Sequence, residues 1–263
     1  MAAKRTVLVL HGYSQNASIF SKRLGALRRQ CENSIELVFI DAPHVLQPAD
    51  LPGSSTALGA LEATNAAADP TLTPRAWWKF YPDKTLSYGL SESLALIRDV
   101  MKTRRFDGVL GFSQGAAFAA LLASLLEKPY HYAPPFLIDN QPPHPPFQFC
   151  IAVSGFRLRD PFCDPLFDNQ YATPTLHVIG KTDIIVTEER SQSLVAASTK
   201  GRVEYHDGGH FVPSKKQWLK FLHAYMLEPS ADLPSPSMAG CSVPSSGTTT
   251  PAATDGPGGL LKL

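Results

Sequence analysis

The sequence FDGVLGFSQGAAFAALLASLL at residues 106–126 decides the fold. The apolar pair Val109 and Leu110 indicates a buried strand, and the Ala- and Leu-rich run that begins at Ala116 has strong helix propensity. Between them stands Gly-Phe-Ser-Gln-Gly, a G-x-S-x-G match centred on Ser113. A strand, a sharp turn and a helix around such a match are typical of a nucleophile elbow, in which a strained turn exposes the serine hydroxyl. Ser113 is therefore the first candidate for a catalytic residue.

A G-x-S-x-G match by itself is weak evidence. Gly and Ser are common enough that such a match arises by chance in about one chain in ten of this length. An isolated match is better explained as a serine in a glycine-rich loop. The interpretation of Ser113 therefore depends on what the rest of the chain supplies.

Length and composition narrow the class of protein. A chain of 263 residues is long enough for one large core, and its net charge of +1 without a basic cluster argues against nucleic acid and anionic membranes as partners. No apolar run approaches the ~20 residues that span a bilayer, and residues 6–10 are too short for a signal-peptide core. The four cysteines lack C-x-x-C spacing, which favours reduced thiols over a zinc site or disulfides. We expect a cytoplasmic protein without a metal.

Short apolar runs alternate with segments of helical periodicity along most of the chain. The expected strands are residues 6–10, 35–40, 109–110, 147–153, 175–179 and 203–206. The expected helices are residues 17–30, 89–103, 116–126, 188–198 and 214–226. This alternation predicts an α/β fold with a doubly wound, mostly parallel sheet and helices on both of its faces.

Two internal segments and the C-terminal end break the pattern. Residues 44–88 lack periodicity, and residues 128–146 are rich in proline, so both are expected to be irregular excursions at the rim of the fold. Residues 229–263 have few charges or large apolar groups and are expected to form a disordered tail. The prediction is one catalytic domain over residues 1–228, with no large separate cap domain.

A serine nucleophile needs a base, and the base needs a carboxylate to fix its tautomer. Ligand sites of parallel sheets lie at the carboxyl ends of the strands, where Asp183 follows the strand 175–179. The three residues after it, Ile184, Ile185 and Val186, are expected to shield its carboxylate, although a plain helix N-cap is the alternative role for Asp183. Three rival acids lie in a segment with no strand to aim them: Asp160, Asp164 and Asp168.

His210 is the candidate base. It follows the last expected strand and Gly208-Gly209, which give its loop the freedom to return the ring to the sheet edge. The order Ser113, Asp183, His210 is that of the α/β-hydrolases. The rival His206 lies at the end of the strand and has less reach, His177 is expected in the core, and His223 on a helix surface.

Hydrolysis also requires donors for the oxyanion that develops on the substrate. One expected donor is the backbone N–H of Gln114, directly after the nucleophile and at the start of a helix. The second is the backbone N–H of Tyr13, in the polar turn His11-Gly12-Tyr13 that ends the first strand. A simple strand-ending turn is the alternative interpretation of that segment.

Three motifs in this order resemble the fungal serine hydrolase (FSH) family: GFSQG at 111–115, GKTDIIV at 180–186 and HDGGHFVP at 206–213. The resemblance extends over residues 4–227. It implies the α/β-hydrolase fold, a Ser113–Asp183–His210 triad, and action on carboxylic esters or acyl thioesters without a cofactor. Because the family includes thioesterases that release fungal polyketides, it also implies a polyketide acyl group, a polyketide synthase carrier as partner, and a role in fungal secondary metabolism.

Four aromatic residues are candidates for an acyl pocket that suits a medium or long alkyl chain: Trp77, Trp78, Phe156 and Phe211. Ordinary core packing is the alternative role for each of them. Two further functions stay open: a hydrolase-like protein that binds a small molecule without turnover, and a serine peptidase. The intact Ser, Asp and His argue against the first, and no gating domain of a peptidase is evident in the sequence.

Overall fold

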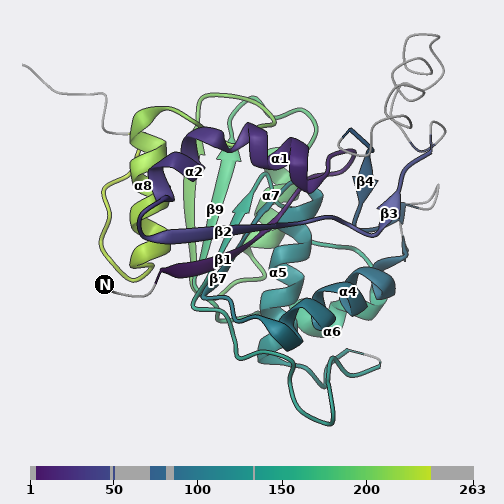
Figure 1. Cartoon of the computed structure of the whole chain (residues 1–263). Coiled ribbons are helices and arrows are strands. Elements are labelled where there is room, and N and C mark those ends of the chain that lie inside the picture. Colours follow the sequence, from purple (N-terminus) through teal and green to yellow (C-terminus); the bar gives the residue numbers. More distant parts are fainter. Residues whose placement is uncertain (1–3, 48–49, 51–71, 81–85, 133, 238–263) are drawn as a thin grey trace, which may run out of the picture.

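The computed structural model describes residues 4–47, 50, 72–80, 86–132 and 134–237. Its centre is a six-stranded sheet in the order β10-β9-β8-β7-β1-β2, and every neighbouring pair is parallel (Figure 1). The strands are β1 (Arg5–Leu10), β2 (Ile35–Ile40), β7 (Gly108–Phe112), β8 (Phe149–Val153), β9 (Thr175–Gly180) and β10 (Gly201–His206). The predicted doubly wound parallel sheet is confirmed.

Helices cover both faces of this sheet (Figure 1). One face carries α1 (Ala17–Arg23), α2 (Gly25–Cys31) and α8 (Lys216–Leu227). The other face carries α4 (Leu90–Thr103), α5 (Gln114–Glu127), α6 (Asp164–Phe167) and α7 (Glu188–Val195). Side chains of β1 alternate between the two resulting cores, with Val7 and Val9 in the first and Leu8 and Leu10 in the second. A strand buried on both faces accounts for the continuous apolar run in the sequence.

The winding direction of the sheet reverses between β1 and β7. From β1 the chain adds β2 on one side, and it then returns to build β7, β8, β9 and β10 on the other. Loops that leave β1 and β7 therefore diverge, and ligand sites of such sheets form in the crevice at this point. His11 follows β1 and Ser113 follows β7, so both lie at this crevice.

Helix α5 is the centre of the second core. All of its residues from Gln114 to Leu126 are buried, as expected for a helix that is apolar on every side. Its first turn packs on the strand ends: a Cβ added to Gly111 would lie 2.1 Å from the carbonyl oxygen of Gly115, and one added to Gly115 would lie 2.3 Å from that of Leu10. Only glycine permits these backbone contacts.

One expected helix differs in the structure. Residues 17–30, predicted as a single helix, form α1 and α2 with a break at Leu24, whose φ of −87° and ψ of 16° leave the helical region. The side-chain periodicity survives the break, because Phe20 of α1 and Leu27 of α2 are both buried against the sheet. Periodicity alone therefore could not reveal the break at Leu24.

Strand pairs and a side-chain hydrogen bond hold parts of the two rim excursions in place. Within residues 44–88, β3 (His44–Val45) pairs with β4 (Arg75–Ala76), and β5 (Lys79–Phe80) pairs with β6 (Ser87–Tyr88); residues 48–49, 51–71 and 81–85 lie outside the described part of the chain. In the proline-rich segment 128–146, the buried ring of His144 accepts a hydrogen bond of 2.9 Å from the N–H of Phe106. This contact ties the excursion to the start of β7.

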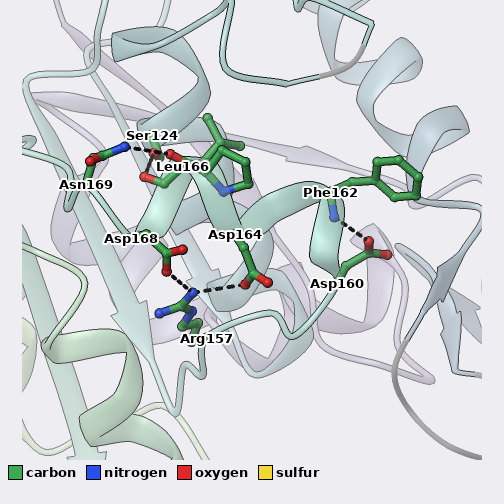
Figure 2. A network of polar contacts seen from close by, with 9 residues as sticks. Ser124, Arg157, Asp160, Phe162, Asp164, Leu166, Asp168 and Asn169 are labelled. Atoms are coloured by element: carbon green, nitrogen blue, oxygen red, sulfur yellow. Dashed lines mark hydrogen bonds and ion pairs between the residues drawn. The ribbon is translucent and has the colours of Figure 1, made fainter.

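The segment with the three rival acids is more regular than predicted. It forms a 3-10 turn, η2 (Pro161–Cys163), followed by α6. Asp164 and Asp168 both bind the guanidinium of Arg157, at 3.0 and 2.6 Å, while Asp160 accepts from the N–H of Phe162 in η2 (Figure 2). Asp164 and Asp168 thus stabilise local structure, and Asp160 also accepts from the N–H of Ser87 at 2.9 Å, which joins η2 to β6.

The first residues of the C-terminal segment 229–263 also differ from the expected disordered tail. Arg202 of β10 donates to the carbonyl of Leu233, and Ser235 donates to the carboxylate of Glu204 at 2.6 Å. Residues 229–237 are thus held along β10 by polar contacts, which a reading of composition cannot detect. Residues 238–263 lie outside the described part of the chain.

The contact between α5 and β1 leads to a prediction on stability. Gly115→Ala would force a methyl group onto the backbone of Leu10, and should lower the free energy of unfolding by about 3 kcal/mol, the upper part of the range for overpacking. Urea unfolding followed by circular dichroism measures the change. The control is Gly25→Ala in α2, where the nearest atom would be 3.7 Å away, so alanine's helix propensity should stabilise the protein. Equal effects of the two substitutions would contradict the prediction.

Candidate active site

Ser113 connects β7 to α5 in a strained backbone conformation. Its φ of 54° and ψ of −117° lie outside the regions that residues with a side chain normally occupy. Its N–H donates a 2.9 Å hydrogen bond to the carbonyl of Val153, which holds the turn against the end of β8. Strain of this kind persists only where the surroundings enforce it, as the packing of α5 on the strand ends does here.

The structure brings Ser113, His210 and Asp183 together in one chain of hydrogen bonds. Nε2 of His210 lies 3.0 Å from Oγ of Ser113, and Nδ1 of His210 lies 2.8 Å from Oδ2 of Asp183. An ionised carboxylate only accepts hydrogen bonds, so Nδ1 carries the proton and Nε2 of the neutral ring is free to accept one from the serine hydroxyl. The three predicted residues therefore have the contacts that a nucleophile, a base and an orienting acid require.

Backbone groups and burial define the state of Asp183. Its second oxygen, Oδ1, accepts the N–H groups of Ile185 and Val186, each at 2.9 Å. Burial opposes the charge, but the hydrogen bonds from His210 and from the N–H of Val186 outweigh it, and the pKa of Asp183 falls below its ordinary value. The carboxylate is thus held ionised, which suits a group that stabilises a positive ring.

The predicted shielding of Asp183 is correct for only one of three residues. Val186 is buried, but Ile184 and Ile185 are 87% and 58% exposed. Their backbone folds tightly around the carboxylate, and this turn directs both side chains outwards. They lie next to the triad as exposed apolar groups, a feature that the sequence analysis missed even though the Ile-Ile pair was visible.

The rival histidines have other partners. Nδ1 of His206 accepts from the N–H of Gly208, Nε2 of His177 lies 3.0 Å from the hydroxyl of Ser198, and Nε2 of His223 lies 2.8 Å from that of Ser34. His206 therefore supports the loop that carries His210. The other two stabilise the packing of neighbouring elements.

The loop after β1 is held by the buried ring of His11. Nε2 of this ring accepts from the N–H of Ala42 at 3.1 Å, so its proton is on Nδ1, which donates to the carbonyl of Gly12 at 2.8 Å. In a trans peptide the C=O and the following N–H point in opposite directions, so this bond also sets the direction of the Tyr13 N–H. Burial lowers the pKa of His11 to about 4 and keeps the ring neutral.

The predicted acyl pocket is wrong for the two tryptophans. Trp77 and Trp78 are both 0% exposed and pack on Phe118 of α5, so their role is in the core. Phe156 is also buried, with the guanidinium of Arg190 4.6 Å from the centre of its ring. Phe211, next to His210 in the chain, is 49% exposed, and the centre of its ring lies 5.0 Å from that of His206.

Exposed apolar side chains thus flank the triad on two loops, with Ile184 and Ile185 after the acid and Phe211 after the base. Within the described part of the chain, no group of three or more His, Cys, Asp or Glu side chains is arranged to hold a metal. Among the described helices, none is long and apolar enough to cross a membrane.

Comparison with known proteins places the chain in a family. Residues 1–222 match the model of the family described as serine hydrolase (FSH1). The chain belongs to the serine hydrolase (FSH1) family. The resemblance noted in the sequence is therefore confirmed, and so is the α/β-hydrolase fold that it implies.

Relatives of this serine hydrolase agree with the family assignment, and solved structures agree with the fold. Esterase AGAP003155 of Anopheles gambiae is 33% identical over 220 residues, which cover 81% of the chain and 73% of the relative. Esterase OVCA2 of Danio rerio is 34% identical over 219 residues, or 79% of the chain and 90% of the relative. Among solved structures, Zea mays acyl-protein thioesterase 2 aligns with a TM-score of 0.53 at 21% identity, covering 86% and 95% of the two chains. Esterase PE8 aligns with a TM-score of 0.57 at 21% identity, covering 86% and 93%.

Buried histidines make the stability of this serine hydrolase dependent on pH. Burial lowers the pKa of both His11 and His177 from 6.5 to about 4, so below pH 6.5 the unfolded chain binds protons that the folded protein does not. Stability is therefore lost as the pH falls from 6.5 towards 4. Each ring should contribute a loss of about 2 kcal/mol at pH 5.

Urea unfolding at pH 7 and at pH 5 measures this loss. His177→Gln, which does not touch the triad, should lose about 2 kcal/mol less than the wild type between the two pH values. An unchanged loss in the variant would show that His177 is not the titrating group.

Proposed function

We propose that this serine hydrolase cleaves carboxylic esters or acyl thioesters through an acyl-serine intermediate on Ser113. The chain of hydrogen bonds from Asp183 through His210 to Ser113 is the observation that carries the proposal. As a family member with relatives named esterases, the chain is a hydrolase of the carboxylesterase or thioesterase class.

In the acylation step, Oγ of Ser113 attacks the carbonyl carbon of the substrate while Nε2 of His210 takes the hydroxyl proton. The carbonyl π electrons move to oxygen, and the resulting oxyanion is stabilised by the N–H groups of Gln114 and Tyr13. Asp183 keeps the ring in the required tautomer and stabilises its positive charge. When the tetrahedral intermediate collapses, the bond to the alcohol or thiol breaks and His210 returns the proton to the leaving group.

Deacylation repeats these steps with water as nucleophile. His210 takes a proton from water, the hydroxide attacks the acyl carbon, and collapse of the second tetrahedral intermediate breaks the bond to Oγ of Ser113. The proton on His210 passes to the serine oxygen, and the carboxylic acid leaves. No cofactor enters either half of this reaction.

The exposed side chains of Ile184, Ile185 and Phe211 support an apolar acyl group as the natural substrate, because they place apolar surface directly beside the triad. A medium or long alkyl chain would cover this surface. A polyketide acyl group, a polyketide synthase carrier and a role in fungal secondary metabolism are narrower proposals that rest on the family resemblance.

A fluorophosphonate probe separates an enzyme from a binding protein. The wild type should be labelled on Ser113, and Ser113→Ala should abolish both labelling and ester hydrolysis, because the hydroxyl that lies 3.0 Å from Nε2 of His210 is that of Ser113. Asp183→Asn should lower kcat by about 10⁴-fold, since an amide favours the wrong tautomer of His210. Wild-type protein that binds an ester without hydrolysing it would favour the binding function, and cleavage of matched p-nitroanilides at a similar rate would favour a peptidase.

The acyl preference is tested with p-nitrophenyl esters and the matched acyl thioesters from two to twelve carbons. A double variant, Ile185→Ser with Phe211→Ser, should lower kcat/KM about tenfold for long chains and leave the acetyl substrate unchanged. The control is Phe162→Ser on η2, an aromatic residue that is more exposed than Phe211 and lies outside the loops that carry the triad. Equal effects on all chain lengths would contradict an acyl-binding role.

A further inference from the structure

We infer that the side-chain amide of Gln114 is a positioning group that sets the spacing of the two oxyanion donors by a hydrogen-bonded link through Trp77 to the loop after β1. The inference rests on the proposed function and deepens it. It assigns a task to a buried amide and a buried indole that the reaction as described above does not use.

The first part of the link joins Gln114 to the segment before β5. Oε1 of Gln114 accepts from the backbone N–H of Trp77 at 2.9 Å, and its Nε2 donates to the backbone carbonyl of Trp78 at 2.8 Å. The amide thus makes one hydrogen bond to each of two adjacent residues of this segment. Because the Gln114 side chain is buried, water does not compete for either bond.

The second part joins Trp77 to the loop after β1, which carries the proposed donor N–H of Tyr13. Its indole Nε1–H donates to the backbone carbonyl of His11 at 2.9 Å. The ring is fixed between two neighbours, with its centre 5.3 Å from that of His11 and 4.9 Å from that of Phe118. Rotation of the indole would break this bond and open a cavity against α5.

The third part lies within the loop itself. The carbonyl of Gly12, whose peptide carries the Tyr13 N–H, accepts both Nδ1–H of His11 and the N–H of Gln15. The link therefore begins on the residue that supplies one donor, Gln114, and ends on the peptide that supplies the other. Covalent connection through β1 and β7, which are paired, closes the frame.

A rigid link between the two oxyanion donors is expected to affect the rate of the reaction. Oxyanion donors accelerate a reaction only when they are oriented before the charge develops, because reorientation during the reaction would cost part of the stabilisation. Displacement of a positioned group by about 1 Å can lower a rate by about 100-fold. Loss of the link should therefore lower kcat, which depends on the transition state, and leave KM nearly unchanged.

The test compares two variants that each remove a hydrogen bond to Trp77. Gln114→Met keeps the length and volume of the side chain but removes both amide bonds. Ser93→Ala removes the hydroxyl of α4 that donates to the carbonyl of Trp77, and leaves the link between the donors intact. Gln114→Met should lower kcat 10- to 100-fold with less than a threefold change in KM, whereas Ser93→Ala should keep kcat within twofold.

A trifluoromethyl ketone supplies the second measurement, because its adduct with Ser113 carries an oxyanion. Its inhibition constant should rise in Gln114→Met by the same factor by which kcat falls, while the pH profile of kcat/KM stays that of the wild type because the triad is intact. If Gln114→Met does not fold, Trp77→Phe, which removes the indole donor together with part of the ring that packs on Phe118, should give the same fall in kcat with a nearly unchanged KM.

Three outcomes would overturn the inference. Unchanged kcat in a folded Gln114→Met would show that the link is dispensable, and equal losses of kcat in Gln114→Met and Ser93→Ala would show a general structural role. A wild type that neither hydrolyses esters nor binds the ketone would overturn the proposed function as well, whereas the first two results leave it standing.

Discussion

The backbone contact between α5 and the end of β1 is the constraint on which the site depends. A Cβ on Gly115 would lie 2.3 Å from the carbonyl of Leu10, so the helix can approach the strand this closely only with glycine at that position. The same approach leaves Ser113 with a φ of 54° and directs it to the crevice between β1 and β7. The energy of the strained turn is offset by the burial of α5, which is apolar on every side.

Two separate systems of hydrogen bonds run through the site. One runs from the backbone of Val186 through Asp183 and His210 to Ser113 and controls the charge and tautomer of the base. The other runs from Gln114 through Trp77 to His11 and holds the backbone of the loop after β1, which carries one of the proposed oxyanion donors. Both are largely buried, and buried hydrogen bonds in a medium of low dielectric hold their partners more tightly than exposed ones. In the proposed mechanism, proton transfer and charge stabilisation thus depend on separate sets of hydrogen bonds.

Some predictions from the sequence were right because they depend on local patterns. The strand before Ser113, the helix after it and the strand ahead of Asp183 follow from apolar runs. Others were wrong because exposure depends on packing between distant segments. Trp77 and Trp78 are buried because α5 presents Phe118 to them, and Ile184 and Ile185 are exposed because the chain turns around Asp183. An aromatic pair or an Ile pair in a loop looks the same in sequence whichever side it faces.

The sequence by itself determined the parallel α/β fold and the identity of the residues that meet at the site, because hydrophobic periodicity and the G-x-S-x-G turn are local properties of the chain. Only the tertiary structure decided how these residues contact one another. The tautomers of His210 and His11 follow from partners 27 and 31 residues away, and Ser113 meets His210 across 97 residues. Hydrogen bonds depend on distance and direction in space, and the packing of α5 against the sheet is what brings these groups within reach.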